Sequence, residues 1–281
     1  MKAALLQLSS SDDPDVNLAD VSNRVSDAAA DGAQWVLTPE VTNLVSLSRR
    51  HQMAHLTQEQ DDPFLAAMRN VAAKNGVWLS LGSLAVKTDD PDGRFANRSF
   101  LINPTGDIVA RYDKIHMFDV AVSPTETYRE SAGFRPGDRA VLAKTDFGTV
   151  GLTVCYDVRF PSLFRYLAQS GAQFITVPAA FSPVTGRAHW EPLLRARAIE
   201  NGVYILAAAQ TGLHPSSGKR RETYGHSMVI SPWGDVLADA GTDVCTIFVD
   251  LEPEEVAKTR GRIPSLLHDR EFLTPNEQPH E

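Results

Sequence analysis

The chain has 281 residues, 43% of them hydrophobic, which is enough for one large core at the upper end of single-domain size. Its net charge of −8 comes from interspersed charges and argues against a nucleic-acid partner or a membrane-surface partner. Two cysteines are too few for a disulfide framework and favour a reducing compartment. The first residues do not form a signal sequence and no apolar run could span a membrane, so we expect a cytoplasmic protein.

The first half of the chain alternates strand-like apolar runs with helices. Asp13-Pro14 and Asp62-Pro63 each place a capping carboxylate before a proline, which predicts the start of a helix. The β-α-β order that results requires a crossover between neighbouring strands. The predicted elements are a strand at 2–8, a helix from 14 to roughly 30, a strand at 35–38, a helix from 63 closed by Gly76, a strand at 77–86, and a hairpin of 96–102 with 108–112.

Two segments of this half have no predicted helix or strand. Residues 41–60 are polar and are expected to be mobile over the edge of the sheet. Residues 115–139 form a long irregular stretch, and such loops inside compact domains are usually functional.

The second half is organised around the stretch Gly148 to Pro161. Its apolar, β-branched start predicts a buried strand, and Pro161 suits the first turn of a helix. Cys155 therefore falls at the joint, where N–H groups and the helix dipole favour a nucleophilic thiolate. The other predicted elements are a strand at 174–178, a loop to Gly186, a helix at 189–201, a strand at 203–210, and a hairpin of 227–230 with 236–238.

The same turn occurs in two places, as Asn-Pro-Thr-Gly-Asp107 and Ser-Pro-Trp-Gly-Asp235, each followed by an apolar strand. We interpret this as weak internal pseudo-symmetry, in which each half of the chain supplies one sheet. The predicted fold is α/β, with two sheets packed as a sandwich and helices outside.

Glu40, Lys114 and Cys155 each lie just beyond the end of a predicted strand, so we expect them to meet at one sheet edge. Together they could transfer an acyl group. Glu40 would take the thiol proton and return it to a leaving amine. Lys114 would favour the thiolate and, with the backbone N–H of Tyr156, hold the oxyanion.

Each of these residues also has a structural interpretation. A free cysteine is usually a small buried hydrophobe, and Cys245, in an apolar run, is expected to be one. Glu40 and Lys114 could be surface charges. The combination of all three groups favours catalysis.

The motifs around these residues resemble those of the nitrilase, or carbon–nitrogen hydrolase, superfamily. Three motifs occur in the order that family has, within roughly Met1 to Pro264, and they are Thr-Pro-Glu40, Tyr-Asp-Lys114-Ile-His and Gly-Leu-Thr-Val-Cys155-Tyr-Asp-Val-Arg-Phe-Pro. The resemblance implies a four-layer αββα sandwich, a thioester mechanism without a cofactor, and a second glutamate, here Glu130, that orients the lysine. We accordingly expect a domain at 1–264 and a tail at 265–281, with the polar end from Thr274 frayed.

Within the superfamily, the stretches 185–191, 194–201, 207–210 and 224–229 are similar to amidases that act on deaminated glutathione. Ser162 and Arg187 depart from that pattern, where Glu and Pro are usual. The ω-amidases, which act on 2-oxoglutaramate, are the enzymatic alternative. A catalytically silent binding protein with the same fold is the alternative from another class.

The expected substrate is a small amide that carries a carboxylate. Basic residues gather around the predicted mouth of the site, and arginine binds carboxylates in bidentate fashion. We expect Arg159, Phe181, Thr185 and Arg187 to contact the substrate, whereas the run Lys219 to Arg221 could equally be a solvated loop.

No metal, nucleotide or macromolecular partner is indicated, apart from a second copy of the chain. His51 and His55 lack a third ligand, and no glycine-rich phosphate loop is present. His116, His189 and His226 are expected to be hydrogen-bonded structural residues. Large apolar residues in 162–167 and 189–201 predict at least a homodimer, although both segments could simply cover their own core.

Overall fold

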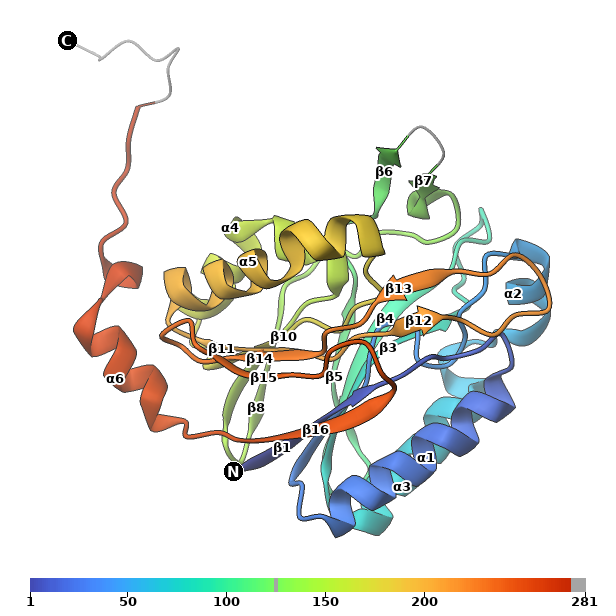
Figure 1. The fold of residues 1–281 in the computed structure, drawn as a ribbon, viewed down its shortest axis with the longest axis horizontal. Helices are drawn as coiled ribbons and strands as arrows, with labels where there is room; N and C mark the ends of the chain where they lie inside the picture. Colours follow the sequence, from blue (N-terminus) through green and yellow to red (C-terminus); the bar gives the residue numbers. More distant parts are fainter. Residues whose placement is uncertain (124–125, 274–281) are drawn as a thin grey trace.

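The computed structural model describes residues 1–123 and 126–273. Two six-stranded sheets pack face to face, and each is covered on its outer side by a pair of helices (Figure 1). Helices α1 (Pro14–Ala30) and α3 (Pro63–Asn75) cover the first sheet, and α4 (Pro161–Gln169) and α5 (Pro183–Asn201) cover the second. The predicted four-layer αββα sandwich is therefore confirmed.

The first sheet has the order β16-β1-β2-β3-β4-β5. Strands β1, β2 and β3 are parallel, as the β-α-β order requires, whereas β4, β5 and β16 each run antiparallel to a neighbour. Its strands are β1 (Lys2–Gln7), β2 (Trp35–Leu37), β3 (Trp78–Val86), β4 (Ala96–Ile102), β5 (Ile108–Asp113) and β16 (Cys245–Asp250).

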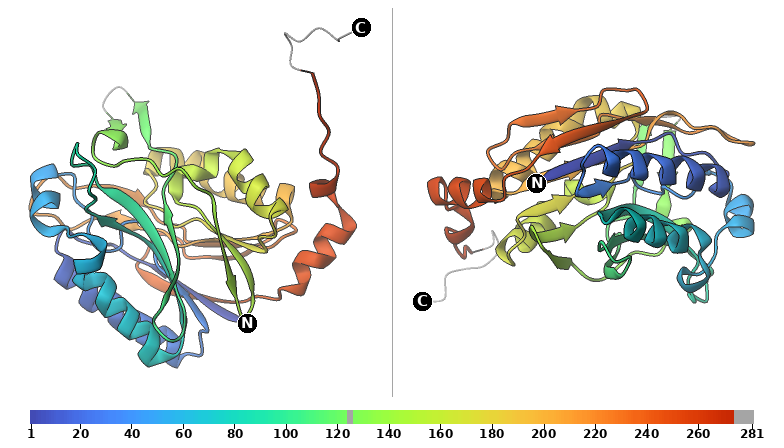
Figure 2. Two further views of the ribbon diagram at one scale, coloured as in Figure 1. Left: turned by 180° about the vertical axis from the view of Figure 1, so that it is seen from behind. Right: turned by 90° about the horizontal axis from the view of Figure 1, so that it is seen from below.

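The second sheet has the order β15-β14-β11-β10-β9-β8, with β9, β10 and β11 parallel. Its strands are β8 (Val141–Thr145), β9 (Gly148–Leu152), β10 (Phe174–Thr176), β11 (Tyr204–Ala207), β14 (Met228–Ile230) and β15 (Val236–Asp239). Because β16 pairs with β1, the second half of the chain contributes a strand to the first sheet, and the prediction of one sheet per half is wrong in this respect. The views of Figure 2 show β16 beside the blue N-terminal strand.

Strand β1 shows why these runs are almost wholly apolar. Ala3 and Leu5 belong to the core between the sheets, whereas Ala4 and Leu6 belong to the core under α1 and α3. Successive side chains point to opposite faces, and both faces are covered, so neither face can be polar.

The predicted helix starts are confirmed. The Asp13 side chain accepts hydrogen bonds from the N–H groups of Asp15 and Val16, and that of Asp62 accepts one from Leu65 N–H. Gly76 ends α3 with a φ of 64°, a left-handed conformation that suits glycine.

Several segments differ from the prediction. Residues 41–60 contain α2 (Arg49–His55) and the short helix η1 (Glu59–Asp61), and residues 115–139 contain the hairpin β6 (Asp119–Ser123) and β7 (Glu126–Arg129), followed by η2 (Glu130–Ala132). The predictions also missed β8 and the hairpin β12 (Thr211–Leu213) and β13 (Glu222–Tyr224). Helix α5 begins at Pro183 rather than at 189, because Pro183 occupies a first-turn position that we had interpreted as loop.

The C-terminal part contains α6 (Glu254–Arg262), within the expected domain, and η4 (Ser265–Leu267), just beyond the expected boundary at 264. Arg165 on α4 donates to the carbonyl of Ser265 at 2.5 Å and forms an ion pair with Asp269, so residues 265–269 are held against the domain. The predicted frayed end from Thr274 lies outside the described residues. Within the described ranges, no helix combines the length and the apolar character needed to cross a bilayer.

His214 is a fully buried imidazole that joins the N-terminal strand region to β13. Its Nδ1 lies 2.8 Å from the carbonyl of Ser10, and its Nε2 lies 2.8 Å from the Thr223 hydroxyl. A carbonyl can only accept, so Nδ1 carries the proton and Nε2 accepts from Thr223. Burial lowers the pKa of His214 to about 4.

We expect this histidine to make the protein less stable in mild acid. The unfolded imidazole takes up a proton near its usual pKa of about 6.5, and the folded one does not until about pH 4. The contribution of His214 to the free energy of unfolding is therefore fully present above about pH 6.5. It is lost as the pH falls from about 6.5 to about 4, by up to about 3 kcal/mol.

Urea unfolding at neutral pH and in mild acid measures this loss. A His214→Asn variant, which can still donate to Ser10 but does not titrate, is the control and should lose less stability across the same range. Equal losses in the two proteins would contradict the assignment.

Candidate active site

Cys155 lies on a sharp turn between β9 and α4. It begins the short helix η3 (Cys155–Arg159) with a φ of 49°, a conformation that non-glycine residues rarely adopt. Its N–H donates to the carbonyl of Pro178 at 2.8 Å, and the side chain is 7% exposed. The turn thus presents the thiol beyond the end of the sheet, as predicted.

Asp157 holds this turn in place. Its buried carboxylate accepts hydrogen bonds from the Tyr112 hydroxyl at 2.7 Å, from the N–H of Val154 at 2.8 Å, and from both the N–H and Nδ1 of His116 at 3.1 and 2.7 Å. The network joins the nucleophile turn to the end of β5, two residues from Lys114. His116 also stacks on Phe160, with ring centroids 3.5 Å apart, which agrees with its expected structural role.

Glu40, Lys114 and Glu130 form one buried ion cluster. Lys114 Nζ lies 2.8 Å from Glu40 Oε1, and 2.9 and 2.8 Å from the two carboxylate oxygens of Glu130. Glu40 follows β2 and Lys114 follows β5 in the first sheet, whereas Cys155 follows β9 in the second. The groups therefore meet where the ends of both sheets coincide, and not at the edge of a single sheet as we had expected.

Backbone and amide groups fix the two carboxylates. The side-chain N–H₂ of Asn97, on β4, donates to Glu40 Oε1 at 2.8 Å and to Glu130 Oε1 at 3.3 Å. Glu130 Oε2 accepts from Phe118 N–H at 2.6 Å, and Glu40 Oε2 accepts from Ala180 N–H at 2.9 Å. Sequence reasoning missed Asn97, because an asparagine within a strand carries no motif.

The charges of the cluster set the protonation of its members. Burial is the largest single effect on Glu40 and would raise its pKa, but the charge and hydrogen bond of Lys114, together with Arg221 and Cys155, lower it overall. Burial would lower the pKa of Lys114, but the charges of Glu130 and Glu40 raise it. Burial and the charge of Glu40 raise the pKa of the Cys155 thiol well above its usual value, although Lys114 acts in the opposite direction.

The resting site thus holds a protonated thiol beside an ionised Glu40, whose negative charge keeps the proton on the sulfur. We had expected Lys114 to favour the thiolate. Lys114 does act in that direction, but burial and the negative charge of Glu40 have larger effects and keep the thiol protonated at rest. A carboxylate base in contact with a thiol is the arrangement that proton transfer during attack requires.

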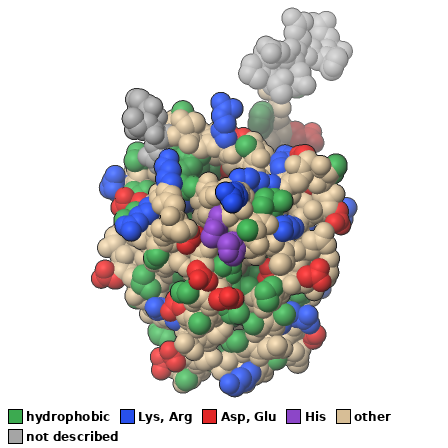
Figure 3. Space-filling model, turned by 90° about the vertical axis from the view of Figure 1, so that its right-hand side faces the viewer, with side chains coloured by type: hydrophobic (Ala, Val, Ile, Leu, Met, Phe, Trp, Pro, Cys, Tyr) green, Lys and Arg blue, Asp and Glu red, His purple; other side chains and the backbone are tan. Residues whose placement is uncertain are grey.

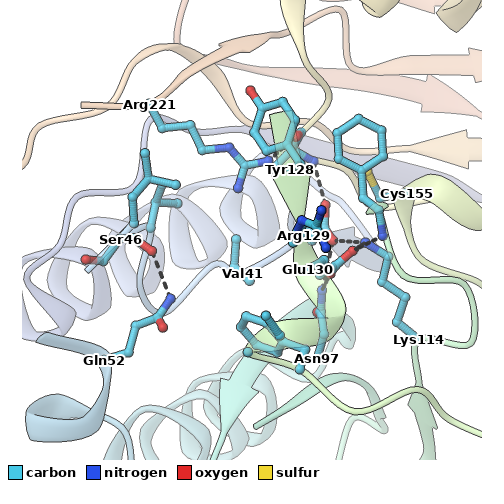
Figure 4. Close-up of a pocket in the computed structure, with 18 of the residues that line it drawn as sticks. Val41, Ser46, Gln52, Asn97, Lys114, Tyr128, Arg129, Glu130, Cys155 and Arg221 are labelled. Carbon is cyan, nitrogen blue, oxygen red and sulfur yellow. Dashed lines mark hydrogen bonds and ion pairs between the residues drawn. The ribbon is translucent and has the colours of Figure 1, made fainter. Parts of the chain in front are cut away.

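A cavity of about 430 Å³ opens onto these groups (Figure 4). Val41, Leu44, Phe118 and Phe134 give it an apolar wall, and Cys155 lies in its lining. The further lining residues include Glu40, Asn97, Lys114, Glu130, Phe181, Ser182 and Arg221, with Arg49, Gln52, Thr127, Tyr128 and Arg129 from α2 and the β6–β7 hairpin. Figure 3 views the side that carries α2, and basic side chains gather over the upper part of this face.

Of the four expected substrate contacts, Phe181 lines this cavity and the others do not. Arg159 lies over the rings of Tyr156 and Phe181, at 5.8 and 5.5 Å, and its guanidinium is 3.2 Å from His189 Nδ1. Thr185 and Arg187 lie on the first turns of α5 rather than in a loop. Arg221, from the run that could have been a solvated loop, does line the cavity.

The backbone N–H of Tyr156 has no acceptor among the residues that the structure describes. It adjoins Cys155 and therefore remains a candidate oxyanion donor. As for metals, the described part of the chain contains no group of three His, Cys, Asp or Glu side chains that could hold an ion. His51 instead approaches the carbonyl of Asp12 with its Nε2, at 2.6 Å, and stacks on His55.

Residues 2–261 match the model of the carbon–nitrogen hydrolase family. The chain therefore belongs to this family of enzymes.

The chain is also similar to individual proteins of this family. The chain is 42% identical to the deaminated glutathione amidase of Yersinia enterocolitica, over 95% of this chain and 92% of that protein. The crystal structure of the C. elegans NitFhit protein superposes with a TM-score of 0.87 at 35% identity, over 96% of this chain and 65% of that one, so this chain spans just under two thirds of NitFhit.

A third similar structure is a variant of an amidase from Nesterenkonia sp. AN1, with a TM-score of 0.76 and 27% identity over 94% of this chain and 98% of that one. That structure shows the product of a Michael addition of acrylamide at its active-site cysteine.

Proposed function

We propose that this protein hydrolyses a carboxylate-bearing amide through a thioester on Cys155, with deaminated glutathione as the substrate. The observation that carries the proposal is the single cavity onto which the Cys155 thiol, Glu40 and Lys114 all open, with Glu40 ionised and paired with Lys114 at 2.8 Å. The relatives named deaminated glutathione amidase support this choice of substrate.

In the proposed reaction, Cys155 Sγ attacks the amide carbon while Glu40 takes the thiol proton. Lys114 and the N–H of Tyr156 hold the oxyanion. Since all three protons of the Lys114 ammonium are on Glu40 and Glu130 at rest, Lys114 would exchange one contact with Glu130 for the oxyanion. The C–N bond then breaks, and Glu40 gives its proton to the leaving amine.

A water molecule next attacks the thioester carbonyl, and Glu40 takes a proton from it. The C–S bond breaks, the acid leaves and the thiol regains its proton. The same carboxylate thus serves as base, acid and base again, which explains why the cavity needs no histidine.

The substrate assignment is tested by comparing kcat/KM for deaminated glutathione, 2-oxoglutaramate and an uncharged amide of equal length. We expect the order of preference to follow that order. Preference for 2-oxoglutaramate would favour the ω-amidase alternative, and preference for the uncharged amide would overturn the carboxylate requirement.

The cytoplasmic location also remains a proposal, supported by two cysteines that are both free.

We further propose a homodimer formed through α4 and α5. Most apolar residues of these helices face their own core, among them Phe164, Trp190 and Leu194. Tyr166 and Ile199, however, point outward and are 61% and 52% exposed. Exposed apolar side chains on adjacent helices are a feature of interaction surfaces.

Light scattering at micromolar concentration is expected to show a dimer, which the double variant Tyr166→Glu, Ile199→Glu should dissociate. Val16→Glu is the matched control, since Val16 is 58% exposed on α1, in the opposite outer layer. A monomeric wild-type protein would contradict the proposal.

A further inference from the structure

The catalytic cavity carries an excess of positive charge in a chain whose net charge is −8. Four basic and two acidic side chains line it, which gives the cavity a net charge of +2. The charged lining residues are Glu40, Arg49, Lys114, Arg129, Glu130 and Arg221. Because Lys114 is paired with both glutamates, the three arginines provide the excess. An anionic ligand is the natural counter-charge.

Arg221 is connected to the reacting groups through a single residue, Ala180. The N–H of Ala180 donates to Glu40 Oε2 at 2.9 Å and also interacts with the Cys155 thiol, and its carbonyl accepts from Arg221 Nη2 at 2.6 Å. The guanidinium therefore lies one backbone residue away from both the nucleophile and its base. In Figure 4 the Arg221 side chain extends into the cavity toward these groups.

Most N–H donors of the Arg221 guanidinium have no acceptor within the described part of the chain. The guanidinium has five N–H donors, and Ala180 accepts from one of its nitrogens. Among the residues that the structure describes, no carboxylate lies within 4.0 Å of it.

The other two arginines are placed differently. Arg49 donates hydrogen bonds to the carbonyls of Gly133 and Gly93, and its guanidinium lies 3.7 Å from the centroid of the Phe95 ring. Both of its terminal nitrogens are therefore already bonded to the backbone. Arg129 is exposed on the β6–β7 hairpin, at the outer end of the lining. Arg221 is the arginine that combines free donors with a position beside the catalytic groups.

We propose that Arg221 binds a carboxylate on the acyl part of the substrate. This inference rests on the proposed amide hydrolysis and adds the residue that selects the acyl group. A five-carbon dicarboxylic acyl group places its free carboxylate four single bonds, about 5 Å, from the carbonyl carbon under attack. Cys155 and Arg221 both line the cavity and both interact with Ala180, so an acyl group on Cys155 lies next to the guanidinium.

The depth of the site favours the acyl part over the leaving amine. The carbonyl of Ala180, a residue that is 2% exposed, holds the partly buried Arg221 guanidinium beside the catalytic groups. A compact acyl group fits there, whereas the amine must have a route out. Arginine binds a carboxylate through two parallel N–H···O bonds, and hydrogen bonds between charged groups are about twice as strong as neutral ones.

The test compares Arg221→Met with Arg220→Met on two amides of equal length, glutaramate and pentanamide. Arg220 is the matched control, because it is the adjacent arginine and is exposed outside the cavity lining. In Arg221→Met we expect kcat/KM for glutaramate to fall by about 10- to 100-fold more than that for pentanamide, mainly through KM. Arg220→Met should leave the ratio unchanged, and Arg221→Lys should be intermediate.

An equal fall for both amides would assign Arg221 a positioning role through Ala180 and overturn the proposal. Unchanged values of kcat/KM for both amides in Arg221→Met would overturn it as well.

A second measurement needs no turnover. Glutarate should protect Cys155 of the wild-type protein from acrylamide, and this protection should be lost in Arg221→Met but not in Arg220→Met. Protection that survives in Arg221→Met would contradict the inference. If the wild-type protein hydrolyses neither these amides nor deaminated glutathione, the proposed function fails, and the protection assay still decides whether Arg221 binds the carboxylate.

Discussion

Replacement of Cys155 by alanine is expected to abolish amide hydrolysis, with a loss of at least about a thousandfold in kcat. The thiol is the one group in the cavity that contacts the base Glu40 and could form a thioester. The fold should survive, because alanine is also small and apolar and can adopt the left-handed backbone conformation about as well as cysteine. Ammonia release and the thermal midpoint, measured on one preparation, separate the two effects.

The second cysteine provides the control. Cys245 lies on β16, away from the cavity lining, and its Sγ is 3.9 Å from the carbonyl of Ala240. Cys245→Ala should keep full activity and still take up one acrylamide, whereas Cys155→Ala should take up none at the site. Retention of a tenth of the wild-type rate in Cys155→Ala would refute the nucleophile assignment. A protein that acquires no adduct at Cys155 would instead be a silent binding protein.

Cys155→Ser should be almost as inactive as Cys155→Ala. Lys114 lowers the pKa of Glu40, which makes Glu40 a weak base. A hydroxyl is far less acidic than a thiol, so the same carboxylate cannot activate it. Among the described residues that line the cavity there is no histidine to replace Glu40 in this role.

The positions of Glu40, Lys114 and Cys155 could be predicted because each follows a strand whose apolar run is easy to identify. The direction of a parallel strand determines where its C-terminal end lies, and the residue just beyond that end inherits the position. This reasoning does not need the register or the packing of the sheets. It therefore predicted that the three residues come together, which the structure shows, even though they belong to two sheets and not to one.

The residues that tune the site could not be predicted in this way. Ala180 matters through a hydrogen bond across the sandwich to Glu40, which depends on how the two sheets are stacked. Asn97 matters through a hydrogen bond from β4 to the end of β2, two strands away in the same sheet. Asp157 is present in the nucleophile motif, but its partners Tyr112 and His116 lie more than 40 residues away.

Thr185 and Arg187, two of the expected substrate contacts, lie outside the cavity lining for a local reason. We took Pro183 as part of a loop, although proline is also favoured in the first turn of a helix. That interpretation put Thr185 and Arg187 at the mouth of the site. For Arg221 the sequence did not decide between a substrate contact and a solvated loop, because a run of three basic residues does not indicate which side chain points inward.

Replacement of Glu40 by glutamine is expected to lower kcat and, at the same time, to make the Cys155 thiol more acidic. A general loss of structure would not produce this combination. The amide of glutamine can still accept from Ala180 N–H but cannot take a proton, so kcat should fall by about a hundred- to ten-thousandfold. A fall in kcat, and not only a change in KM, is required if Glu40 is the base.

The thiol of the same variant should become more acidic. Burial and the charge of Glu40 both raise the pKa of Cys155, and glutamine removes the second cause while the opposing charge of Lys114 remains. The pH midpoint of thiolate formation should therefore move down in Glu40→Gln. The ultraviolet absorbance of the thiolate reports this midpoint, with the double variant Glu40→Gln, Cys155→Ala as the blank.

If Glu40→Gln has both a lower kcat and a more acidic Cys155 thiol, the step that it slows is not thiolate formation. If Glu40 acted on the thiol through its charge alone and were not the base, the midpoint would move down without a large fall in kcat. If thiolate formation were the limiting step, the lower midpoint would make Glu40→Gln faster and not slower. We expect neither, because the same proton must also reach the leaving amine, and without Glu40 no residue in the described cavity lining is placed to deliver it.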